Sequence, residues 1–236
     1  MTQEDFNQTY ILQNNVNSFA FLYHDATKLL ELAKDPKLTA PDKSVILCRT
    51  ALLLYIISLE GLINYALAYF SPENLRKFIL DREEKLGIRE KWELLPMMLK
   101  NETFDFSKYP WSHFSELITI RNDYVHPKHN RKAYYKAEKS KKWKALLINE
   151  IPRDSNIKEK DVVYRQTRIP KAVTAIQTEH VETVKTVVDD MIEELNKLLD
   201  GRIKKEGWFK TEHLKLIYPD GAKLDDLRQL DEQGLP

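Results

Sequence analysis

Residues Ala51 to Phe70 read ALLLYIISLEGLINYALAYF, a run of twenty residues in which Glu60 carries the single charge. A helix of this length and composition could cross a bilayer. A charged side chain at the centre of a membrane helix, however, costs roughly 2.5–3.5 kcal/mol on insertion scales. Asn64 lies one turn after Glu60, and Arg49 lies three turns before it on the same helical face. A helix with a thin polar line and apolar sides is typical of the centre of a soluble bundle, where we expect this segment.

The rest of the chain continues the helical pattern. Its 236 residues include only 6 glycines and 10 prolines, so turns are few and long elements are expected. Apolar residues recur at three- and four-residue intervals. They predict helices over residues 4–34 (one helix or two in succession), 42–70, 72–86, 88–99 with an interruption near Pro96, 111–125 and 178–199. Asp42, Ser71 and Thr178 are the expected N-caps, and Gly201 is expected to stop the last helix.

We therefore predict an all-α fold, an antiparallel helical bundle over residues 1–201. A basic, less regular insertion at about residues 128–170 interrupts this domain, and a short strand is expected within it at 162–168. Residues 202–236 are predicted to form a C-terminal tail.

Composition and charge exclude several classes of protein. The 37 basic and 36 acidic residues give a net charge of +1, so any nucleic-acid-binding surface must be local. The single cysteine, Cys48, excludes an internal disulfide and a zinc knuckle, and its apolar helix face indicates a core residue. The chain has no glycine-rich phosphate loop, dinucleotide fingerprint, HExxH pair or GxSxG elbow. It begins without a secretory signal, and we expect a cytoplasmic protein with no metal and no cofactor.

Residues 128–144 form a strongly basic segment. They include eight basic residues and one acidic residue, with Tyr134, Tyr135 and Trp143 interleaved. Lysine and arginine bind phosphates, and bases can stack on aromatic rings. The candidate RNA-binding residues are Lys128, Arg131, Lys132, Lys136, Lys141 and Lys142. The alternative is that the charged run is a solvated face.

The segment Phe114 to Lys128, FSELITIRNDYVHPK, holds the residues best suited to catalysis. Pro127 disfavours helical geometry at His126, so the helix should end there. On an ideal helix Asn122 and His126 share a face, and Arg121 lies roughly 140° from His126. A long arginine and a frayed helix end still allow the two to converge. Histidine can exchange a proton with a ribose 2′-hydroxyl or a leaving oxygen, and a guanidinium can hold the scissile phosphate.

These properties make Arg121 and His126 the candidate catalytic residues, with Asn122 in support. The alternative is an arginine that caps a helix beside a histidine favoured by the helix dipole. The string RNDYVH resembles the R-x4–6-H signature of the HEPN superfamily, including the polar residue that often follows the arginine. The stretch Leu52 to Leu67 is similar to the long second helix of such domains, and the likeness covers about residues 45–199.

The resemblance implies an all-α bundle that forms a homodimer and brings two such sites together in a cleft. Many HEPN members are metal-independent endoribonucleases in toxin–antitoxin, phage-defence and RNA-processing systems. Arg121 and His126 would then cleave RNA by attack of the 2′-hydroxyl, and an antitoxin protein would be a further partner. HEPN toxins paired with nucleotidyltransferase antitoxins commonly carry a tyrosine two residues after the histidine. This chain has Lys128 there, so regulation by tyrosine modification is not expected.

Two other hypotheses stay open for the whole chain. One is a non-catalytic HEPN module that binds RNA or a nucleotide, or acts as a scaffold. The other is a helical bundle in which the motif is accidental. Glu60 also has two interpretations: it pairs with Arg49 or a neighbouring helix, or it holds Arg121, since a carboxylate inside an apolar bundle needs a partner.

Overall fold

The computed structural model describes residues 11–14, 18–37, 41–82, 85–126, 133–137, 143–210 and 214–217. The chain divides into two units, residues 18–209 and a unit formed by the two chain ends. In the terminal unit, β1 (Ile11–Asn14) pairs antiparallel with β4 (Leu214–Ile217), with Ile11 opposite Ile217. The helix predicted over residues 4–34 is therefore wrong at residues 11–14, where pairing with a distant apolar segment gives a strand.

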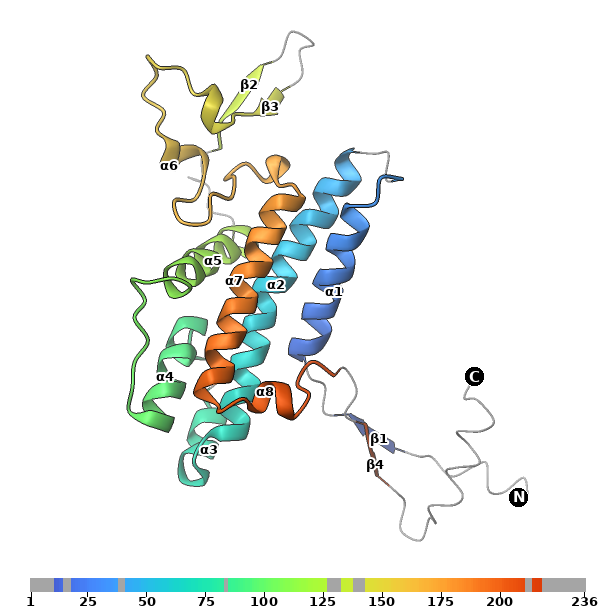
Figure 1. The fold of residues 1–236 in the computed structure, drawn as a ribbon, viewed down its shortest axis with the longest axis vertical. Coiled ribbons are helices and arrows are strands. Elements are labelled where there is room, and N and C mark those ends of the chain that lie inside the picture. Colours follow the sequence, from blue (N-terminus) through green and yellow to red (C-terminus); the bar gives the residue numbers. More distant parts are fainter. Residues whose placement is uncertain are drawn as a thin grey trace, which may run out of the picture. The chain divides into compact units, whose positions relative to one another are not determined.

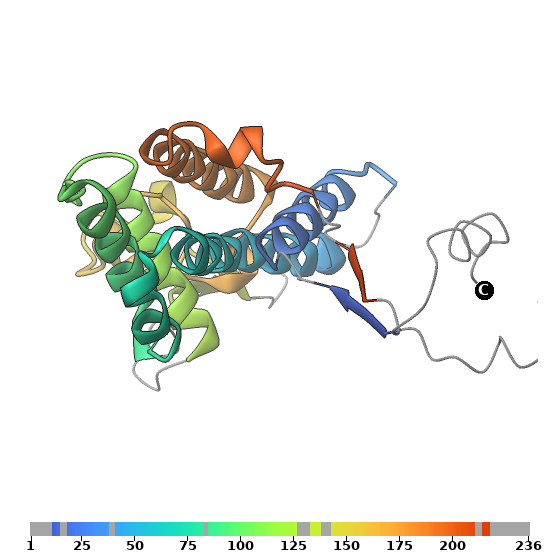
Figure 2. The ribbon, with the colours of Figure 1, turned by 90° about the horizontal axis from the view of Figure 1, so that it is seen from below.

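The larger unit is all-helical in its main part, as predicted. Seen along its helices, α2 (Pro41–Phe70) lies between α1 (Ser18–Ala33) and the pair α4 (Ile88–Lys100) and α5 (Trp111–Val125), with α7 (Thr178–Leu198) packed along it (Figure 2). α1 runs antiparallel to α2, but α7 runs in the same direction as α2 (Figure 1).

The core is built around α2. Its buried side chains contact the facing helices on several sides and include Leu52, Tyr55, Ile56, Leu59, Leu62, Ile63, Ala66 and Leu67. Gly61 allows the close approach of α1, because a Cβ at this position would lie 3.0 Å from the backbone nitrogen of Phe19. Trp92 of α4 packs edge-on against Trp111 and Phe114 of α5, which fixes these two helices beside the middle of α2.

Long apolar helices raise the question of a membrane. Within the described residues, one helix, Lys43–Phe70, is long and apolar enough to cross a bilayer. Half of its most apolar window is buried inside the protein, and α1, α4, α5 and α7 all contact it. This placement is that of the core helix of the bundle.

Several helix ends differ from the predicted ones. α2 already includes Pro41, so Asp42 is not its N-cap. Ser71 does not cap α3 (Glu73–Leu80), because its hydroxyl donates to the carbonyl oxygen of Leu67. α4 continues through Pro96 without interruption. Thr178 is the first residue of α7, and Gln177 takes the N-cap position, donating its backbone N–H to His180 Nδ1 at 3.1 Å.

The insertion between α5 and α7 contains several short elements. A ribbon of β2 (Tyr135–Ala137) and β3 (Trp143–Ala145) is followed by the 3-10 helix η3 (Ile148–Glu150), α6 (Glu159–Val162) and the 3-10 helix η4 (Val173–Ala175). The strand predicted at 162–168 is reduced to a single bridge between Val163 and Pro170. The chain then passes through α7 and the left-handed Gly201 into α8 (Arg202–Lys205).

Candidate functional site

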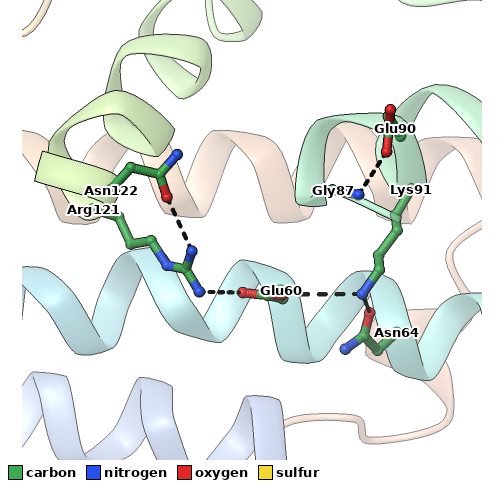
Figure 3. Close-up of polar contacts among 7 residues, drawn as sticks. All are labelled: Glu60, Asn64, Gly87, Glu90, Lys91, Arg121 and Asn122. Atoms are coloured by element: carbon green, nitrogen blue, oxygen red, sulfur yellow. Dashed lines mark hydrogen bonds and ion pairs between the residues drawn. The ribbon is translucent and has the colours of Figure 1, made fainter. Parts of the chain in front are cut away.

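Arg121 lies on α5 and reaches the middle of α2. Its Nη2 donates to Glu60 Oε2 at 3.2 Å, and its Nη1 donates to Asn122 Oδ1 at 3.0 Å (Figure 3). Glu60 is thus paired with a residue of a neighbouring helix. It is not paired with Arg49, the candidate partner on α2 itself. The ion pair is the contact expected if Glu60 positions Arg121.

Lys91 is a second cation at the same carboxylate, and the sequence motif does not include it. Its Nζ donates to Asn64 Oδ1 at 2.8 Å and lies 4.0 Å from Glu60 Oε1 (Figure 3). The Lys91 side chain comes from α4 and is only 3% exposed. The sequence does indicate that Lys91 faces the core, because Ile88, Lys91 and Leu95 follow the spacing of a core-facing helical stripe.

The cluster of Glu60, Lys91 and Arg121 holds two positive charges and one negative charge. Among the residues that the structure describes, no other carboxylate lies within ion-pair distance of either cation. The two ends of the cluster differ in access to solvent: the Arg121 and Glu60 side chains are 27% and 28% exposed, whereas Lys91 is enclosed. A net positive charge that is open at the arginine end suits the binding of an anion such as a phosphate.

Asn122 connects Arg121 with His126. Its side-chain oxygen accepts from Arg121, and its backbone carbonyl oxygen accepts the N–H of His126 at 2.8 Å. His126 ends α5 with a φ of −124°, as the following proline predicts, and its side chain is exposed. Across the described ranges, no side-chain hydrogen bond joins His126 to Arg121. Asn122 is thus hydrogen bonded to Arg121, whose side chain is 27% exposed, and His126 is exposed at the end of the same helix.

The basic segment is only partly described. Lys128, Arg131, Lys132, Lys141 and Lys142 lie outside the described residues. Lys136 lies on β2, and its ammonium group forms an ion pair with Glu150. The hydrogen bond from Lys136, with a second from the backbone N–H of Leu147, lowers the pKa of Glu150. The charge of Lys136 is thus offset within the insertion.

Cys48 is a core residue, as predicted. Its side chain is fully buried, and burial raises the pKa of its thiol. A thiol that is more firmly protonated is a poorer nucleophile. Within the described part of the chain, no three His, Cys, Asp or Glu side chains are grouped so that they could hold a metal ion.

Comparison with known proteins gives no further guide to the site. No protein-family model matches the chain, and neither the curated proteins nor the solved structures that were compared with it give a match. The chemistry of the Glu60–Arg121–Asn122 contacts and of His126 is therefore the basis for a functional assignment.

Proposed function

We propose that the protein is a metal-independent endoribonuclease of the HEPN type, acting in the cytoplasm as a homodimer. The observation that carries this proposal is the position of Arg121. Its guanidinium is held by Glu60 and Asn122 and remains partly open to solvent, and Arg121 precedes the exposed His126 by five residues. A toxin–antitoxin or phage-defence system would be a fitting setting for such an activity.

The proposed reaction is transfer of a phosphodiester to the neighbouring ribose hydroxyl. The 2′-hydroxyl loses its proton and attacks phosphorus, the bond to the 5′-oxygen breaks, and that oxygen takes up a proton. Arg121 would bind the non-bridging oxygens and offset the charge that develops on them. His126 would accept or donate one of the two protons. A second site across a dimer cleft would supply the other proton-transfer group.

The roles of Arg121 and His126 can be tested with purified protein and a labelled RNA in the presence of EDTA. Wild-type protein should leave a 2′,3′-cyclic phosphate and a 5′-hydroxyl. Arg121→Ala and His126→Ala should each lower the cleavage rate by about a hundredfold or more. Arg49→Ala and His113→Ala, which change the same residue types elsewhere on α2 and α5, should cleave at the wild-type rate. Wild-type cleavage by either Arg121→Ala or His126→Ala would remove that residue from the mechanism.

The alternative is a non-catalytic HEPN module that binds RNA. The contacts of Arg121 with Glu60 and Asn122 favour this alternative to some degree, because they occupy the guanidinium within the protein. Under this alternative RNA binds without being cleaved, and Arg121→Ala changes stability more than it changes affinity. Measuring binding and cleavage on the same RNA separates the two functions.

A further inference from the structure

One face of the β2–β3 ribbon is packed against the rest of the insertion. Leu146 donates its backbone N–H to the carbonyl oxygen of Tyr134 at 2.9 Å, which extends the strand pairing by one step. Both side chains contact a small apolar cluster that includes Val162 and Val163. Lys136 shares this face, because alternate residues of a strand point the same way, and it is paired with Glu150. This side of the ribbon is therefore fixed by apolar contacts and an ion pair.

The opposite face carries two aromatic rings that are open to solvent. Tyr135 lies opposite Ala145 and Trp143 lies opposite Ala137, so both aromatic side chains project from the same face of neighbouring strands. Tyr135 is 41% exposed and Trp143 is 74% exposed. Trp143 is the most exposed large apolar side chain in the described ranges, whereas the other three tryptophans are at most 4% exposed. Among the described residues, the ribbon thus presents two exposed rings on this face, on which Ala145 is buried.

The insertion is hydrogen bonded to the helix that carries the candidate catalytic residues. Glu116 of α5 accepts the backbone N–H of Thr167 at 2.7 Å and its hydroxyl at 2.8 Å. Two turns further along α5, Asp123 accepts the hydroxyl of Tyr164 at 2.7 Å. The ribbon also follows His126 closely in the chain. Its aromatic face is therefore part of a structure anchored to α5 on either side of Arg121.

The composition of the segment that contains the ribbon indicates a polyanion as the ligand. The segment of residues 128–144, which contains the ribbon, has eight basic residues and one acidic residue. Lysines and arginines bind phosphates whatever the nucleotide sequence. Exposed aromatic rings stack on any base, because every base has a π-face. Base stacking requires unpaired nucleotides, because the faces of bases inside a duplex are already covered by their neighbours.

We propose that Trp143 and Tyr135 form a base-stacking platform for single-stranded RNA, which selects unpaired RNA for the Arg121–His126 site. The choice of RNA as the polyanion rests on the proposed function. The platform itself rests on the ribbon's register, the exposure of its two rings and the charge of the surrounding segment.

Trp143 provides its own reporter. Because the other tryptophans are buried, Trp143 should supply the long-wavelength emission that acrylamide quenches readily. The His126→Ala protein is used for the titration, so that RNA is not cleaved while it binds. It is titrated with a single-stranded oligouridine and with a blunt RNA duplex of equal length at fixed salt. The single strand should quench this emission strongly, and the duplex should leave it nearly unchanged.

Substitutions test the rings directly, with affinity measured by anisotropy of labelled RNA. Trp143→Leu should weaken single-strand binding by about tenfold, within the range known for loss of one stacked base. Trp143→Phe keeps a ring and should retain most of the affinity while losing the emission signal. Phe78→Leu is the matched control, because it removes another exposed aromatic ring, on α3, and should leave affinity unchanged.

Any of three binding results would overturn the platform. These are equal quenching by the duplex, wild-type affinity in Trp143→Leu, and a blue shift of Trp143 emission with protein concentration alone, which would show a protein–protein interface. The outcomes also separate this inference from the nuclease proposal. Binding through Trp143 without cleavage by wild-type protein leaves the platform standing and removes the nuclease. Cleavage of single strands at the wild-type rate by Trp143→Leu leaves the nuclease standing and removes the platform.

Discussion

Replacing Glu60 with glutamine tests whether the carboxylate is the common anchor of Lys91 and Arg121. Glutamine keeps the shape of the side chain and removes its charge. Lys91 then holds a positive charge that is 3% exposed, with the Asn64 amide oxygen as its hydrogen-bond partner. Arg121 is 27% exposed and can turn towards water at little cost. The loss of stability should therefore come mainly from Lys91.

The expected size follows from the burial of these groups. Removing one partner of a fully buried ion pair costs about 3–5 kcal/mol, because the other charge is left uncompensated. Here the carboxylate is 28% exposed and Lys91 keeps one hydrogen bond. We therefore expect Glu60→Gln to lower the free energy of unfolding by about 2 kcal/mol. For a chain of this length that corresponds to a fall in Tm of about 4–8 °C.

Lys91→Met should behave differently, because it removes the buried charge itself. Glu60 still has Arg121 and water, so the free energy of unfolding should change by less than about 1 kcal/mol. The double variant should then resemble Lys91→Met, which gives a coupling energy of about 2 kcal/mol between the two positions.

Urea denaturation followed by circular dichroism at 222 nm measures all three variants, and the slope with urea checks that each unfolds as wild type does. Additive effects of the two substitutions, or a Glu60→Gln protein as stable as wild type, would refute the shared-anchor reasoning. A Lys91→Met protein less stable than Glu60→Gln would refute the assignment of the cost to the buried ammonium group.

Three further predictions concern other parts of the bundle. Burial and the hydrogen bond to Asp189 raise the pKa of Tyr23 from 10.0 to about 12, so the folded state holds this proton more tightly than the unfolded chain. The free energy of unfolding should consequently fall as pH rises from about 10 to 12, and urea titrations of Tyr23→Phe should show a smaller fall. Gly201 has a φ of +82°, so Gly201→Ala should cost about 1–2 kcal/mol in the same assay, and an unchanged midpoint would contradict the left-handed turn. Glu116→Gln should speed amide hydrogen exchange at Thr167 by about tenfold or more, because a charged acceptor is lost, and unchanged exchange would contradict the anchor of the insertion.

The helical elements could be predicted from the sequence because their signals are local. The period of apolar residues locates the main helices, and Pro127 marks the end of α5 at His126. Pro96 was expected to interrupt α4, but the helix continues through it. Proline inside a helix costs about 3 kcal/mol, yet burial of Trp92 and Leu95 on the same helix keeps α4 continuous. The pairing of β1 with β4 is also beyond local patterns, because the two strands come from opposite ends of the chain.

The contacts of Glu60 show which part of a site a sequence can reveal. Arg49 shares a helical face with Glu60, but eleven residues of helix separate them by about 16 Å, which is beyond the reach of a direct ion pair. A partner from another helix was therefore required. Periodicity shows that Lys91 belongs to a core-facing stripe, but the direction in which α4 meets α2 depends on the packing of Trp92 against α5. Local sequence cannot supply that geometry.

The same contacts connect the stability of the bundle with the proposed chemistry. Arg121 must turn at least one N–H of its guanidinium from Glu60 towards a phosphate if it is to bind RNA. Were Arg121 the only cation near Glu60, this movement would leave a half-buried carboxylate without a counter-charge. Lys91 remains 4.0 Å from the other carboxylate oxygen, and Asn64 keeps Lys91 in place. Lys91→Met should therefore weaken RNA binding by Arg121 even though it preserves the fold, because Glu60 would then hold Arg121 more tightly.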